Sequence, residues 1–268
     1  MRTIKKAELT TQQIVGLTIL IISFGVLLFF LARLNLQELT DKEICHNSVV
    51  LYDKNPNPLK SNALDCRTSY VCISGGGDCG DFSSTIKREI KLTSDENTNK
   101  DRIMKQLAEE MADCWWMFGE GKVDYANFEG FGNKICAMCS VIAFDKTIQG
   151  KDYSITYEEF YKFLESTPKD EAEFYLSYIY NTPDKNKIGA SEDYLSRKLI
   201  FTEQYFILTG MGKSWINWGL NKHWLPMGFE DIFGRKLFDQ EYVIPLTILE
   251  KTPENFEELG CDEFITKA

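Results

Sequence analysis

The longest apolar run in the chain extends from residue 14 to residue 32. It carries no charged side chain and is rich in Ile, Leu and Phe. A helix rises about 1.5 Å per residue, so a run of this length can cross the hydrocarbon core of a bilayer. Basic residues outnumber acidic ones before it, which places the amino terminus in the cytoplasm. The pattern predicts a cytoplasmic tail at 1–13, a single-pass transmembrane signal anchor at 14–34 and an extracytoplasmic remainder.

Two other interpretations of the amino terminus stay open. A cleavable secretory signal has an apolar core of about 7–15 residues and a small-x-small cleavage site, whereas this run is longer and ends Phe30-Leu31-Ala32-Arg33. The pair Lys6-Ala7 before Glu8 resembles the site that archaeal prepilin peptidases cut, which would make the chain a type IV pilin-like subunit. The large cysteine-rich block after the anchor is unlike a pilin head, so we favour the uncleaved anchor.

Helical periodicity returns after the anchor. Residues 35–58 predict a helical stalk that ends at two closely spaced prolines, and residues 59–268 predict one extracytoplasmic domain. Between 99 and 118 apolar residues recur at 3.6-residue spacing, and the turn Gly119-Glu120-Gly121 ends this helix. Thr156 and Glu159 have the spacing of a capping box at the start of another helix.

Strand patterns separate the helices. Residues 85–93 alternate between apolar and charged side chains, which predicts a half-buried antiparallel strand. Further strands are expected at 64–73, 135–144, 198–209 and 242–249, with a turn at 210–212. Pro245 interrupts the last strand, which makes it an edge strand. The predicted fold class is α+β: one amino-terminal transmembrane helix, then a disulfide-stabilised domain with a mostly antiparallel sheet and several helices.

Charge excludes one class of partner. The net charge of the chain is −10, and the anchor region is itself basic, so the outer block is more acidic still. Nucleic-acid binding needs a basic face, and so does lying flat on anionic lipid. We therefore expect no nucleic-acid partner, and lipid contact only through residues 14–34.

The eight cysteines all follow the anchor. They are Cys45, Cys66, Cys72, Cys79, Cys114, Cys136, Cys139 and Cys261. An even number on the oxidising side of a membrane indicates structural disulfides. Eight cysteines allow 105 pairings, so the spacing alone leaves the connectivity open. No metal site and no cofactor is predicted.

Four cysteine-bearing stretches resemble a known family. They are Cys45-His46-Asn47-Ser48-Val49-Val50-Leu51, then Leu64-Asp65-Cys66-Arg67-Thr68 with Cys72 behind it, then residues 113–122 and residues 136–145. They resemble an uncharacterised family of single-pass membrane proteins from small-genome (DPANN-type) archaea. The resemblance covers roughly residues 10–180 and implies an archaeal envelope location and a common architecture. It implies no activity.

The sharpest local motif is Cys136-x-x-Cys139. A redox pair of this spacing sits at a helix amino terminus, which lowers the pKa of the first thiol. Here a strand-like run follows, so we expect each cysteine to form a structural disulfide with a different partner. Thiol-redox chemistry is the alternative. A zinc site would need two more ligands, such as Cys72 and Cys79, and an oxidising compartment disfavours it.

Two further features carry candidate chemistry. Glu120, Asp124 and Glu129 follow an aromatic helix end, and paired carboxylates beside Trp can hydrolyse a glycoside; solvated acids at a helix terminus are the simpler interpretation. A possible interaction surface comprises Trp215, Trp218, Trp224 and Phe229, although core packing explains most such clusters. The leading functional hypothesis is a non-enzymatic envelope interaction or assembly subunit with a protein partner. The alternative is an extracytoplasmic enzyme, either thiol-redox or a glycan-directed hydrolase.

Overall fold

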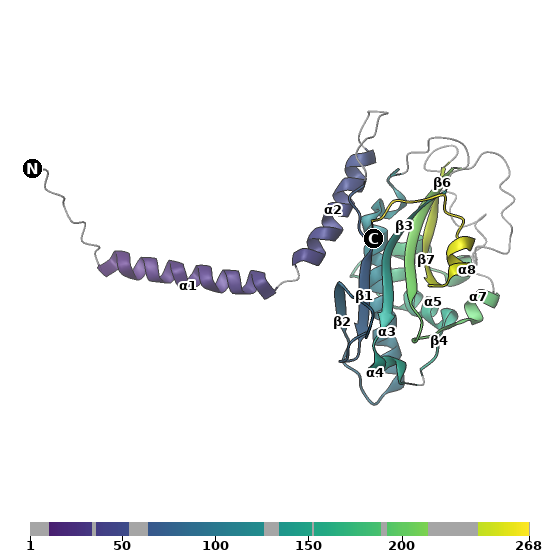
Figure 1. The fold of residues 1–268 in the computed structure, drawn as a ribbon, viewed down its shortest axis with the longest axis horizontal. Helices are drawn as coiled ribbons and strands as arrows, with labels where there is room; N and C mark the ends of the chain where they lie inside the picture. Colours follow the sequence, from purple (N-terminus) through teal and green to yellow (C-terminus); the bar gives the residue numbers. More distant parts are fainter. Residues whose placement is uncertain are drawn as a thin grey trace, which may run out of the picture. The chain divides into compact units, whose positions relative to one another are not determined.

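The structure is a computed structural model of the 268-residue chain, shown in Figure 1. It describes residues 11–33, 36–53, 64–125, 134–151, 153–188, 192–213 and 241–267. The contacts divide the chain into two compact units, Met1–Asp41 and Lys42–Ala268.

The first unit contains helix α1, Thr11–Arg33. Its large apolar side chains from Ile14 to Phe29 are all exposed, by 49% to 64%. Two hydroxyl groups bond within the helix, because Thr18 Oγ1 donates to the Ile14 carbonyl at 2.8 Å and Ser23 Oγ to the Leu20 carbonyl at 2.9 Å. Among the residues that the structure describes, no helix combines the length and apolarity that a membrane crossing requires. The transmembrane helix predicted at 14–34 is therefore not confirmed.

Helix α2, Leu36–Asp53, confirms the helix predicted after the anchor. From Lys42 onward its residues belong to the second unit. Cys45 and Val49 are buried there in the main hydrophobic core. The second half of α2 is thus part of the folded domain.

A buried charge cluster holds this half of α2. Glu110 is buried and accepts hydrogen bonds from Arg88 Nε at 3.0 Å and Nη2 at 2.8 Å. Lys42 Nζ lies 3.8 Å from the Glu110 carboxylate and 2.6 Å from Asp113. Burial raises the pKa of Glu110, and the two cations oppose that rise. The cluster joins α2 to helix α3, Glu96–Met117, and to the segment that carries Arg88.

One sheet organises the second unit. Its strands are β1 Ser69–Ser74, β2 Ile86–Glu89, β3 Lys134–Phe144, β6 Tyr205–Lys213, β7 Glu241–Glu250 and β8 Glu263–Phe264. The order is β2-β1-β3-β6-β7, with β8 also paired to β3. The long strands β3, β6 and β7 are antiparallel, whereas β1 runs parallel to β2 and to β3. A separate two-stranded sheet pairs β4, Ile155–Thr156, with β5, Lys198–Leu199.

The alternation of buried and exposed side chains at 85–93 is confirmed. The prediction that this strand runs antiparallel to its neighbour is wrong. Ile86 and Ile90 are buried as expected. The partner strand β1 is parallel, with Val71 opposite Ile86. Alternation reports that one face of a strand is buried, and it carries no information about the direction of the neighbour.

The carboxyl-terminal segment completes the sheet beside β3. Strand β1 pairs only with the second half of β3, from Ser140 onward, and β8 pairs with Ile135 and Cys136 in the first half. A register shift between Met138 and Ser140 marks the change of partner. The Ile265 amide also donates to the Cys136 carbonyl at 3.0 Å. The last residues therefore occupy the place that β1 leaves open.

Strand β6 starts later than predicted, at Tyr205, and the turn predicted at 210–212 is wrong. Gly210 and Met211 continue the strand and pair with Ile244 and Val243 of β7. Gly210 lies where β7 carries an extra residue between the Leu208 and Gly210 pairings, a local irregularity of the kind where strand glycines are found.

Among the described strands, β7 lies at the edge of the sheet, as predicted, and its outer side is covered. The Tyr180 hydroxyl donates to the Leu246 carbonyl at 2.8 Å, and the Tyr194 hydroxyl donates to the Ile248 carbonyl at 3.4 Å. These bonds satisfy backbone groups that would otherwise pair with another strand.

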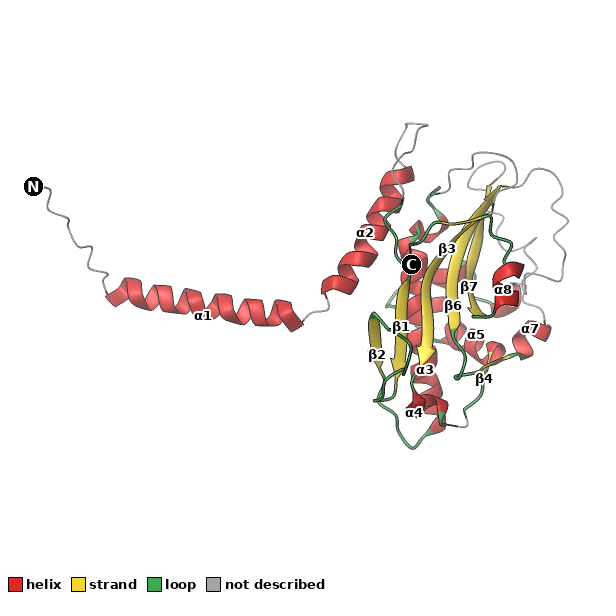
Figure 2. Cartoon of the chain, viewed as in Figure 1, coloured by secondary structure: helices red, strands yellow, loops and turns green. Residues whose placement is uncertain are grey.

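Helices cover both faces of the sheet (Figure 2). They are α3 Glu96–Met117, α4 Lys146–Gln149, α5 Tyr157–Ser166, α6 Tyr175–Tyr180, α7 Glu192–Ser196 and α8 Pro253–Glu258, with 3-10 turns at Gly119–Gly121 and Lys185–Lys187. The main core joins α3, α5 and α6 to one face through residues such as Leu107 and Ile142. A smaller cluster of Val141, Phe206 and Leu208 lies under α8 on the other, outer face. The predicted helix at 99–118 and the capping box of α5 are both confirmed.

Candidate binding pocket and the predicted site residues

All eight cysteines are paired in four disulfides. The pairs are Cys45–Cys66, Cys72–Cys79, Cys114–Cys139 and Cys136–Cys261, and no cysteine is free. The disulfide prediction is confirmed, including separate partners for Cys136 and Cys139. Neither cysteine of the motif offers a thiolate for redox exchange or for zinc in this state.

Strand alternation explains how two cysteines three residues apart reach different partners, because positions separated by an odd number of residues in β3 point to opposite faces of the sheet. Cys139 lies in the main core and bonds to Cys114 of α3. Cys136 bonds to Cys261, which packs against the cluster on the outer face. The two disulfides therefore fix the sheet to the layer on each of its faces.

Glu120 sits in a strained turn. Gly119, Glu120 and Gly121 all have positive φ, at 75°, 56° and 66°. The Glu120 carboxylate accepts hydrogen bonds from the Tyr178 hydroxyl at 2.8 Å and from Lys122 Nζ at 2.5 Å. Burial raises the pKa of this carboxyl, but the two hydrogen bonds outweigh burial and lower it below the usual range. A glycosidase acid needs a raised pKa instead, so the geometry favours an ionised structural residue.

A pair of variants tests this structural role of Glu120. Both E120A and E120G lose the two hydrogen bonds, but only glycine relieves the left-handed backbone, by about 1 kcal/mol. We expect E120G to be more stable than E120A by about that amount in urea unfolding. The matched control is Lys105 inside α3, where K105G should be less stable than K105A. An E120G that is no more stable than E120A would contradict the strain argument.

The predicted aromatic surface of Trp215, Trp218, Trp224 and Phe229 lies outside the described residues. It stays a prediction. Among the described residues, no three His, Cys, Asp or Glu side chains come together in a way that could hold a metal ion.

The glycine-rich turn after β1 holds an internal anion. The amides of Gly75 and Gly77 donate to Asp145 Oδ2 at 3.1 and 2.7 Å, and Ser74 Oγ donates to the same oxygen at 3.1 Å. Asp145 is buried and also caps α4, since the Ile148 amide donates to Oδ1 at 3.0 Å. The turn is therefore closed around a carboxylate of the chain itself, and these amides are not offered to an external phosphate.

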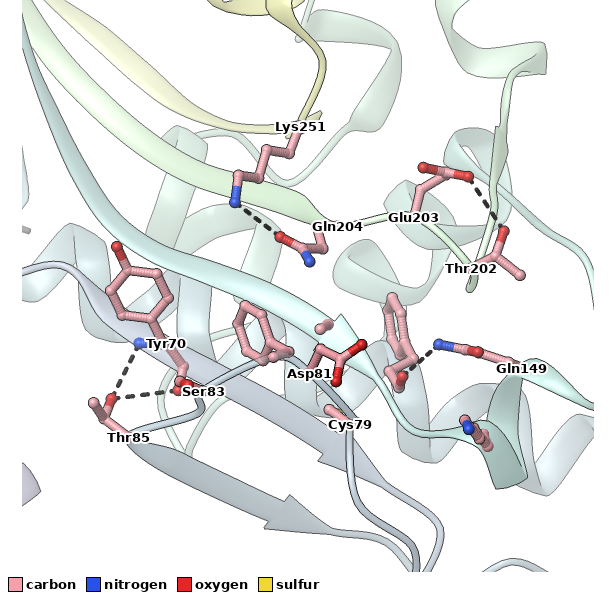
Figure 3. Close-up of a pocket in the computed structure, with 15 residues that line it drawn as sticks. Tyr70, Cys79, Asp81, Ser83, Thr85, Gln149, Thr202, Glu203, Gln204 and Lys251 are labelled. Carbon is pink, nitrogen blue, oxygen red and sulfur yellow. Dashed lines mark hydrogen bonds between the residues drawn. The ribbon is translucent and has the colours of Figure 1, made fainter.

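The candidate site is a cavity of about 830 Å³ beside this turn. It opens where β3 ends, β6 begins and β7 ends, and the loop between β1 and β2 forms one wall. Figure 3 shows Lys251 and Gln204 on one side of the cavity, with Tyr70 and Asp81 on the other. Its volume is in the range of small-molecule sites.

Two structural features shape the loop wall. Cys79 lines the cavity, and its disulfide to Cys72 in β1 ties the loop to the sheet. The Tyr70 and Phe82 rings lie 5.9 Å apart at 53°, and both pack against the cluster on the outer face. This wall presents aromatic surface to the cavity.

The opposite walls are polar. Lys251 Nζ donates to Gln204 Oε1 at 2.9 Å, which leaves the Gln204 amide group as a donor. Gln149 Nε2 donates to the Phe144 carbonyl at 2.7 Å, which leaves its amide oxygen as an acceptor. Sequence reasoning missed these residues because they come from separate loops with no shared motif.

Comparison with known protein families, with curated proteins and with solved structures finds no match to this chain. The pocket is therefore interpreted from its own geometry, and the resemblance to an archaeal membrane family stays a prediction.

Proposed function

We propose that this chain is an extracytoplasmic protein, anchored to the cell membrane, that acts by binding within the envelope and not by catalysis. The observation that carries the proposal is that all eight cysteines form disulfides. Disulfides persist in oxidising compartments and are rare where thiols are kept reduced. Their number supports a location outside the cytoplasm.

Helix α1 supports the anchoring part of the proposal. Exposed apolar side chains from Ile14 to Phe29 are unfavourable in water and favourable in lipid. Thr18 and Ser23 satisfy their hydroxyl groups on carbonyls of the same helix, as polar groups in hydrocarbon must. The anchor proposed here uses residues 14–34, with the amino terminus inside and the folded unit outside.

Flotation of the full chain with lipid vesicles tests the anchor. The wild-type protein should float with the vesicles. L20R places a charge in the middle of α1, which costs about 2.5–3.5 kcal/mol and should weaken partitioning about a hundred-fold. The control is L51R, because Leu51 is a similarly exposed leucine of α2 and its substitution should not change flotation. A wild-type protein that stays in the aqueous fraction would overturn the anchor.

Two further experiments test the orientation of the chain in the membrane and the retention of its amino terminus. Protease added to whole cells should degrade the carboxyl-terminal block and spare the first residues. Mass spectrometry of the amino-terminal peptide should find residues 1–34 retained. A mature start at Glu8 would favour the pilin-like alternative, and a start beyond Arg33 would favour a secreted protein.

A further inference from the structure

The charges around the cavity cancel. Lys146 and Lys251 line it together with Asp81 and Glu203, so neither sign of charge prevails. A phosphate or carboxylate site gathers several cationic or amide donors, and a cation site gathers oxygen ligands. The balance here favours a ligand without net charge.

The walls have two different characters. Tyr70 and Phe82 line the cavity on the side of the loop. Figure 3 shows Gln204 and Lys251 on the side opposite Tyr70, next to the start of β6 and the end of β7. A ligand that fits both walls has an apolar face and an edge of hydrogen-bonding groups. A sugar ring has this form, because its C–H groups make an apolar face and its hydroxyl groups surround it.

Several polar groups are placed to meet hydroxyl groups. The Asp81 side chain is exposed at the cavity, and its carboxylate can accept hydrogen bonds on both oxygens. The Gln204 amide is held in place by Lys251 and still has its donors, while Gln149 contributes an acceptor. Planar amide and carboxylate groups of this kind bond to adjacent hydroxyl groups in pairs.

We propose that this pocket binds a neutral carbohydrate, which stacks on Tyr70 and Phe82 and donates hydroxyl hydrogens to Asp81. The inference rests on the proposed extracytoplasmic location, where surface glycans are the abundant neutral polyhydroxyl ligands. It gives the envelope-binding role a ligand class and a site.

The test uses the full chain in a polyoxyethylene detergent, because a detergent with a sugar headgroup would compete. The probes are maltotriose, cellotriose and N,N′-diacetylchitobiose, measured by saturation-transfer NMR and by titration calorimetry. At least one should bind saturably, with magnetisation transferred to its ring protons. Glycine betaine and inorganic phosphate are tested in parallel and should not bind.

Variants assign binding to the pocket. D81A should weaken binding about ten-fold or more, since it removes a hydrogen bond to a charged acceptor. F82A should weaken binding by a similar factor through lost stacking. The controls are D78A, an exposed acid of the same loop, and F256A, an aromatic on the outer face beyond the cavity, and both should bind as the wild type does. Asp81 is exposed, so D81A keeps the test valid even if F82A fails to fold.

Three results would overturn the proposal: no binding of any of the three saccharides, equal binding by D81A and D78A, or saturable binding of betaine or phosphate in their place. Binding in detergent does not depend on vesicle flotation. Failure of the carbohydrate proposal is therefore distinguishable from failure of the membrane anchor.

Discussion

Replacing both Cys136 and Cys261 by alanine is expected to lower the free energy of unfolding by about 5 kcal/mol. The two cysteines are 125 residues apart, and a cross-link that closes so long a loop removes much entropy from the unfolded chain. The disulfide also holds the carboxyl-terminal segment in the gap beside β3, where the Ile265 amide bonds to Cys136. Its loss should release that segment from the sheet.

The Cys72–Cys79 disulfide is the matched control. It also joins a buried cysteine to a partly exposed one, but its cysteines are only 7 residues apart. The same relation gives a loss of about 2.5 kcal/mol for C72A/C79A. Denaturant unfolding of both double variants measures the difference. Equal losses would show that loop length does not set the contribution of these disulfides.

Alkylation of free thiols tests the disulfide pairing directly. The native protein without reductant should take up no label, because its cysteines are all paired. The single variant C136A should expose one reactive thiol, which peptide mapping should place at Cys261. Rapid labelling of Cys136 in the wild-type protein would instead restore the thiol-redox alternative.

The substitution D145N is expected to cost about 3–5 kcal/mol. The Asp145 carboxylate accepts from the amides of Gly75, Gly77 and Ile148 and from the hydroxyl groups of Ser74 and Thr147, at 2.7 to 3.1 Å. Asparagine has the same shape, but its NH₂ group would face donors. Whichever way the asparagine side chain turns, at least one buried amide loses its acceptor, at about 1–3 kcal/mol, and the remaining hydrogen bonds lose a charged acceptor. Urea unfolding at pH 7 measures the loss.

The exposed Asp78 of the same loop provides the control. D78N should change the stability by less than about 0.5 kcal/mol, because the ion pair between Asp78 and Lys87 is exposed to solvent. A D145N protein as stable as D78N would show that the carboxylate does not hold the glycine turn.

The loss in D145N should depend on pH. Burial raises the pKa of Asp145, but the hydrogen bonds from Thr147, Gly75, Ile148 and Gly77 outweigh burial and lower it below its ordinary value of 3.8. A carboxyl with a lowered folded-state pKa contributes its full stability above the unfolded value and loses it as pH falls through the folded value. The gap between wild type and D145N should therefore narrow below about pH 4, in unfolding curves at pH 7 and pH 2.5. A constant gap would contradict this linkage.

Local patterns in the sequence determined the elements that depend on neighbouring residues. The apolar repeat of α3 and the capping box of α5 predicted helices that the structure confirms, because a helix is built from contacts three and four residues apart. The strand-like run after Cys139 predicted, correctly, that Cys136 and Cys139 take different partners. The even number of cysteines predicted that all of them form disulfides. That prediction rests on composition and on an oxidising compartment, and it needs no knowledge of which residues are neighbours.

Only the tertiary structure decided which distant segments meet. The parallel pairing of β1 with β2, the one connectivity among 105 and the insertion of β8 beside β3 all join residues whose separation leaves no local signal. The pocket is the extreme case, because Tyr70, Gln204 and Lys251 become neighbours only through the order of strands in the sheet. Chain periodicity records whether a residue is buried, whereas the identity of its neighbour is set by packing between segments.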